Sequence, residues 1–135
     1  MKKIRRMTLE RGPCFGPCPV YRVTVDAHGK VGWAGEAFAA SLGQSNWHIP
    51  PNAVASLEDA LAHASFEGLR DKYTDYSITD MPSANTSVVF DDGTNKTIEH
   101  YHGNLSAPKK LTLLENRIDR ILKTRERIRC NKGLD

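Results

Sequence analysis

The sequence predicts an α+β domain with a single, mainly antiparallel sheet, built from two hairpins and covered on one face by two helices. Two segments alternate apolar and polar residues on either side of a turn, which is the pattern of a hairpin. Two other segments repeat apolar residues at helical spacing. The length of 135 residues fits one domain, which we assign to residues 1–130, followed by a short C-terminal tail at 131–135.

The first half of the chain predicts most of the strands. Residues 2–10 alternate in character and predict a first strand. The clearest hairpin covers 21–35, because every second residue in 21–25 is apolar and a His-Gly turn at 28–29 precedes a returning strand. A further short strand is expected at 46–49.

The second half adds the helices and another hairpin. A proline pair opens a helix predicted over 51–64, and residues 66–84 are expected to be mostly loop. The second hairpin covers 86–102 around an Asp-Asp-Gly turn. A long helix is predicted over 108–128, with an apolar stripe formed by Leu111, Leu114, Ile118, Ile121, Leu122 and Ile128.

Composition and motifs narrow the class of function. A hydrophobic content of 39% and a charged content of 26% are typical of globular proteins and not of disordered ones. The sequence has no apolar run long enough to span a membrane and no apolar stretch after its basic start, so we expect a cytoplasmic protein unless a signal peptide precedes residue 1. No phosphate-binding glycine loop, nucleophile elbow or His-Glu-x-x-His sequence occurs, which favours a non-enzymatic role.

The most distinctive stretch is the loop RGPCFGPCPVY, residues 11–21. Each of its three prolines fixes its own backbone and pushes the preceding residue toward an extended conformation, while Gly16 can adopt a positive φ and reverse the chain. Cys14 and Cys18 lie in this stiff loop. Four states are open to them: reduced and buried small side chains, which we expect, a disulfide, a metal site, or a dithiol redox pair.

The same loop carries a family resemblance. Its octapeptide CFGPCPVY resembles the C-F-G-x-C-P-x-Y signature of the bacterial domain-of-unknown-function family 6438. The glycine turn near residue 29, the Asp-Met-Pro at 80–82 and the closing helix are also similar to that family. The resemblance implies a fold and a marked loop but no activity. The signature residues are Cys14, Phe15, Gly16, Cys18, Pro19 and Tyr21.

A metal site is the first alternative to a plain binding role. Cys14 and Cys18 would need two more ligands, and the best candidates are His100 and His102, which lie on the same face of a predicted strand. Zinc or copper would suit these ligands. We expect no cofactor, however, and a solvent-facing histidine pair.

A nucleic-acid surface is the second alternative. Residues 109–135 contain nine Lys or Arg against four Asp or Glu, so the closing helix is basic. A solvated helix face explains such a pattern more often than phosphate binding does. The candidate phosphate contacts are Arg117, Arg120, Lys123, Arg125, Arg127 and Arg129.

The sequence therefore favours a non-enzymatic binding or interaction module with a rigid Cys/Pro/Gly loop. A protein or a small molecule is a better candidate for the partner than a nucleic acid, and no membrane partner is expected.

Overall fold

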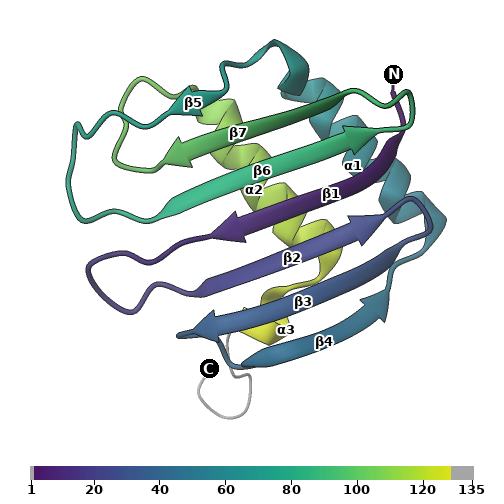
Figure 1. Cartoon of the computed structure of the whole chain (residues 1–135), viewed down its shortest axis with the longest axis horizontal. Helices are drawn as coiled ribbons and strands as arrows, with labels where there is room; N and C mark the ends of the chain where they lie inside the picture. Colours follow the sequence, from purple (N-terminus) through teal and green to yellow (C-terminus); the bar gives the residue numbers. More distant parts are fainter. Residues whose placement is uncertain (1, 129–135) are drawn as a thin grey trace.

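A computed structural model describes residues 2–128. It contains one seven-stranded sheet in the order β4-β3-β2-β1-β6-β7-β5, with α1 and α2 packed on the same face (Figure 1). The strands are β1 (Ile4–Arg11), β2 (Val20–Asp26), β3 (Lys30–Ala37), β4 (Gly43–His48), β5 (Lys72–Tyr73), β6 (Ser83–Phe90) and β7 (Asn95–Tyr101). The helices are α1 (Pro51–His63), the short 3-10 turn η1 (Phe66–Gly68), α2 (Lys109–Leu122) and α3 (Arg125–Ile128).

The sheet is antiparallel except at one edge. Both predicted hairpins are present, as β2–β3 and β6–β7, and β1 joins them by pairing with β2 on one side and β6 on the other. Segment 66–84, predicted to be mostly loop, also contains η1 and the two-residue strand β5, which pairs with β7 in parallel. The sheet is therefore mixed. After α1 the chain returns to the edge formed by β7, and β5 runs there in the same direction as β7.

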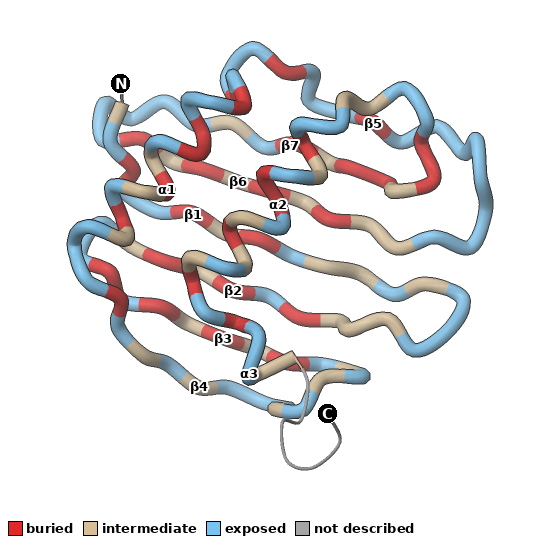
Figure 2. The backbone as a smooth tube through the Cα atoms, turned by 180° about the vertical axis from the view of Figure 1, so that it is seen from behind, coloured by how far each residue is buried: buried red, intermediate tan, exposed pale blue. Residues whose placement is uncertain are grey.

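The core lies between the sheet and the two helices. Figure 2 views the molecule from the helix side and shows buried residues alternating along the strands beneath α1 and α2. The buried face of α2 is formed by Leu111, Leu114, Glu115, Ile118 and Leu122, so one charged residue lies within the apolar stripe. No helix in the described range 2–128 is long and apolar enough to cross a membrane.

The helix predicted over 108–128 is interrupted. Helix α2 ends at Leu122, Lys123 adopts a left-handed conformation with φ of 60°, and α3 follows. The Thr124 hydroxyl donates a hydrogen bond of 2.7 Å to the Asp119 carboxylate, which stabilises the turn. The tail assigned to 131–135 lies outside the described residues.

The burial pattern of α2 leads to a matched pair of substitutions. Leu114 is 3% exposed and its neighbour Leu113 is 60% exposed, although both are leucines on the same helix. We expect Leu114→Ala to lower the free energy of unfolding by about 2–5 kcal/mol, because it removes buried methyl groups and leaves a cavity. Leu113→Ala should stay within about 0.5 kcal/mol of the parent. Urea titrations measure both, and equal losses would contradict the orientation of α2.

Candidate functional site

Three connections meet at the end of the sheet where β1 and β7 finish (Figure 1). They are the β1–β2 loop at 12–19, the β5–β6 loop at 74–82 and the β7–α2 connection at 102–108. Backbone hydrogen bonds join them: Phe15 donates to Asp80 at 3.3 Å, and His102 donates to Pro82 at 2.9 Å. The signature loop and the predicted histidines therefore belong to one end of the molecule.

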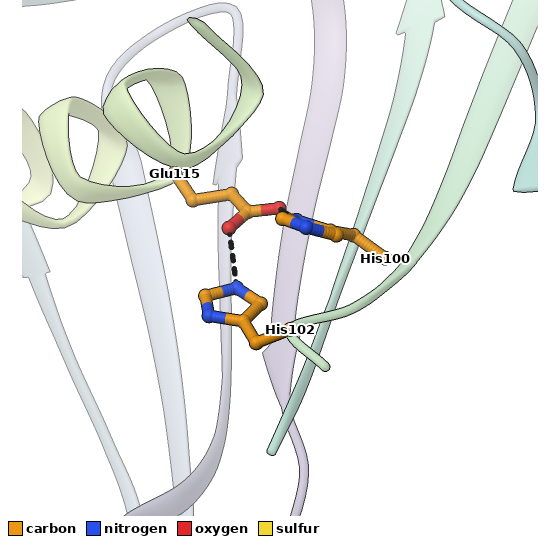
Figure 3. Close-up of side chains that lie close together, drawn as sticks. All are labelled: His100, His102 and Glu115. Carbon is orange, nitrogen blue, oxygen red and sulfur yellow. Dashed lines mark hydrogen bonds and ion pairs between the residues drawn. The ribbon is translucent and has the colours of Figure 1, made fainter. Parts of the chain in front are cut away.

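His100, His102 and Glu115 converge between β7 and α2 (Figure 3). His100 Nδ1 lies 2.6 Å from Glu115 Oε2, and His102 Nε2 lies 2.8 Å from Glu115 Oε1. Each histidine thus contacts a different oxygen of one carboxylate. The two imidazole rings are close to each other as well, with centroids 4.3 Å apart.

The Glu115 carboxylate is fully buried, at 0% exposure, and His100 is 3% exposed. Burial favours the neutral form of Glu115, but the hydrogen bonds from His100 and His102 outweigh it and lower the pKa of Glu115 below its usual value. An ionised carboxylate only accepts hydrogen bonds, so each imidazole donates an N–H to it. The site is a buried carboxylate whose hydrogen-bond partners are two imidazole rings.

The three side chains also have the chemistry and spacing of a group that could hold a metal ion. One ligand atom from each of His100, His102 and Glu115 lies within 4.8 Å of the others. Imidazole nitrogen and carboxylate oxygen are both ligands of Zn²⁺ and Cu²⁺. His102 is half-buried, so solvent can reach one side of the cluster.

The structure corrects the expectation of a solvent-facing histidine pair. His100 lies on the helix side of β7, and His102, one residue past the end of that strand, turns toward the same glutamate. Glu115 was not among the predicted site residues. Its position was nevertheless visible in the sequence, because it lies four residues from Leu111 and three from Ile118, on the apolar stripe of the helix.

The cysteines are joined, in contrast to the reduced and buried state that we expected. Cys14 and Cys18 form a disulfide with their Cα atoms 5.7 Å apart. Both cysteines are half-buried, and Phe15 is 86% exposed, so the ring does not cover the sulfurs. Gly16 has the expected positive φ, 149°, and Cys18 donates its backbone N–H to the Gly16 carbonyl at 3.0 Å, so the chain reverses and brings the sulfurs together.

The disulfide also leaves Cys14 and Cys18 without the free thiolates that the predicted four-ligand metal site requires. Cys14 and Cys18 bond to each other and are not part of the ligand cluster found among the described residues. A disulfide sulfur is not the thiolate that binds zinc. The side chain that lies beside both histidines is Glu115.

Asp119 anchors both ends of the signature loop. Its Oδ1 accepts the hydroxyl of Tyr21 at 2.6 Å, and its Oδ2 accepts Arg11 Nε at 2.9 Å. Arg11 directly precedes the loop at 12–19, and Tyr21 follows it after Val20. Burial and the nearby Asp119 charge raise the pKa of the Tyr21 hydroxyl, which therefore stays protonated as a donor. Tyr21 also stacks on Trp33, with ring centroids 4.6 Å apart.

The predicted phosphate contacts are spread over α2, α3 and the turn between them. Arg117 is half-buried, and Arg127 lies with its guanidinium carbon 4.5 Å from the centroid of the Trp47 ring. Arg129 lies outside the described residues. The exposed members are Arg120, Lys123 and Arg125. A nucleic-acid role stays a prediction.

The fold and the site define a small α+β domain with a disulfide-closed signature loop and a buried histidine–glutamate cluster. Residues 5–122 match the family described as Domain of unknown function (DUF6438). The match covers most of the chain, which therefore belongs to this family. No curated protein matches the chain.

The anchoring of the loop can be tested by Asp119→Ala. This change leaves the largely buried Arg11 guanidinium without its ion-pair partner at 2.9 Å. We expect the free energy of unfolding to fall by about 3 kcal/mol or more, because an unpaired buried charge is costly. The matched control is Asp59→Ala at an exposed position of α1, which should change stability by less than about 0.5 kcal/mol. Similar losses for both variants would contradict the role of Asp119.

The disulfide should contribute modestly to stability. Its two cysteines are only four positions apart, so breaking the bond releases a short loop. We expect the double variant Cys14→Ser, Cys18→Ser to lose about 2 kcal/mol, by the loop-entropy estimate for so small a ring, and to keep its fold. Denaturant titration combined with circular dichroism measures this. Loss of the folded state would show that the loop supports the whole domain.

Proposed function

We propose that the protein is a binding module for a divalent transition-metal ion, held by His100, His102 and Glu115. The observation that carries the proposal is the convergence of two imidazole nitrogens and a fully buried carboxylate, with one ligand atom from each within 4.8 Å of the others. The proposal assigns binding and no reaction. A binding role was also favoured by the sequence. The ligand proposed beside the two histidines is now Glu115 instead of Cys14 and Cys18.

Electrostatics support a cation at this position. A carboxylate removed from water is stable only when hydrogen bonds and positive charge compensate it. The two imidazoles supply hydrogen bonds to this carboxylate. A metal ion would take the place of the two N–H protons that lie between the rings and the carboxylate, and would bring the charge as well.

The ligand types favour zinc, with copper as the competitor. Two histidines and one carboxylate are a known protein ligand set for a zinc ion that keeps its fourth position for water or another ligand. His102 is the ligand nearest to solvent, since 20% of its side chain is exposed. We therefore expect the fourth position to open on the His102 side, where the ion can exchange.

The test is a calorimetric titration of the chelator-treated protein with ZnCl₂, beside the variants His102→Ala and His63→Ala. We expect one zinc ion per chain and a higher melting temperature with zinc, because binding to the folded state alone stabilises it. His102→Ala should weaken binding by about 100-fold or more, since loss of even an outer-shell partner costs 10–100-fold. His63 is exposed on α1 and serves as the matched control, with unchanged affinity.

Two outcomes would contradict the proposal. One is the absence of stoichiometric zinc or copper binding to a protein that circular dichroism shows to be folded. The other is equal affinity in the parent and in His102→Ala. A Glu115→Gln variant adds a second check, because it keeps the side-chain shape but removes the charge and should also lose the ion.

A further inference from the structure

The disulfide lies outside the packed interior. Residues 12–19 are all exposed or half-buried, whereas the strands that flank them contribute buried side chains to the core. The loop that carries the disulfide extends past the end of the sheet (Figure 1). An oxidised and a reduced form of this loop can therefore exist on the same folded framework.

The framework holds the loop in place without the disulfide. Arg11 and Tyr21 are fixed by Asp119, and β1 and β2 pair with each other up to Arg11 and Tyr21 themselves. Between these anchors, Gly12 donates a backbone hydrogen bond to Ser83. Breaking the sulfur–sulfur bond would loosen only the short segment between Arg11 and Tyr21, and both ends of that segment would stay in place.

An apolar surface accompanies the disulfide. Phe15, the residue after Cys14, exposes its ring to solvent and donates its backbone N–H to Asp80 at 3.3 Å. Met81, next to Asp80, is exposed as well, and so are Tyr76 and Ile78 in the same loop. Phe15 lies inside the ring closed by Cys14 and Cys18, so a protein that approaches the disulfide would meet its exposed side chain. A small thiol can attack the disulfide without contacting an apolar side chain.

From these observations we propose that Cys14–Cys18 is a thiol–disulfide exchange site whose partner is a protein dithiol that docks on Phe15. This proposal is independent of the metal site. A partner thiolate attacks one sulfur of the disulfide, which forms a mixed disulfide and releases the other cysteine as a thiolate that takes up a proton. The second partner thiolate then attacks the mixed disulfide and releases the remaining cysteine. The Cys14–Cys18 pair gains two electrons and two protons, and the partner dithiol becomes a disulfide.

The experiment uses the folded, oxidised chain in a Cys130→Ser background, which leaves Cys14 and Cys18 as the only cysteines. The probes are a thioredoxin, as the protein dithiol, and dithiothreitol, as a small dithiol without a docking surface. Free thiols are alkylated at intervals and counted by mass spectrometry. A thioredoxin that lacks its second cysteine should accumulate as a mixed disulfide with the chain.

Phe15→Ala separates exchange with a docked protein from chemical reduction. We expect this variant to react with thioredoxin several-fold more slowly and with dithiothreitol at the parent rate. Leu113→Ala is the matched control, since it removes an exposed apolar side chain from α2 and should change neither rate.

Three results would overturn the proposal. The first is reduction by thioredoxin only at the rate of global unfolding, which would make the disulfide purely structural. The second is an equal effect of Phe15→Ala on both dithiols, which would show that the ring does not dock the protein. The third is a thioredoxin rate that Phe15→Ala leaves unchanged.

Discussion

Two carboxylates of α2, those of the fully buried Glu115 and the half-buried Asp119, constrain the rest of the structure. Glu115 and Asp119 lie one turn apart on the sheet-facing side of the helix, where apolar residues surround them. A carboxylate in such a place is stable only if donors and cations reach it. The sheet provides them at two positions: the histidines at the end of β7, and Arg11 and Tyr21 at the adjacent ends of β1 and β2.

This constraint explains why the signature loop and the histidines share one end of the fold. The Asp119 contacts fix the ends of the loop, and the Glu115 contacts fix the end of β7. The loop between these anchors contributes no buried side chain, so its residues are free to serve contacts with other molecules. The Glu115 cluster is buried, so it suits a small ion and not a macromolecule.

The hairpins and the two main helices could be predicted from the sequence because the residue patterns that define them are local. Alternation around glycine turns predicted both hairpins, and the helical spacing of apolar residues predicted α1 and most of α2. Strand β5 was missed, since a two-residue strand has no periodicity and depends on the edge of β7. The end of α2 was missed because it depends on Thr124 reaching back to Asp119, although the residues around it keep a helical pattern.

The site was predicted in part for a similar reason. His100 and His102 were recognised as a pair, but their burial depends on α2 folding back over β7, and the alternation within the strand does not show this contact. Glu115 was visible as a charged residue on an apolar stripe, and Asp119 follows one turn later. The joining of Cys14 and Cys18 depends on the backbone path at Gly16, which spacing alone does not determine.

The most direct test of the claim that Glu115 and its histidines hold a cation is anomalous diffraction from crystals of the protein grown with zinc. Data collected on either side of the zinc absorption edge locate the ion without reference to any variant. We expect one strong anomalous peak per chain, bounded by His100, His102 and Glu115. A fully bound zinc ion at another position, or an empty cluster with both imidazoles still hydrogen-bonded to Glu115, would contradict it.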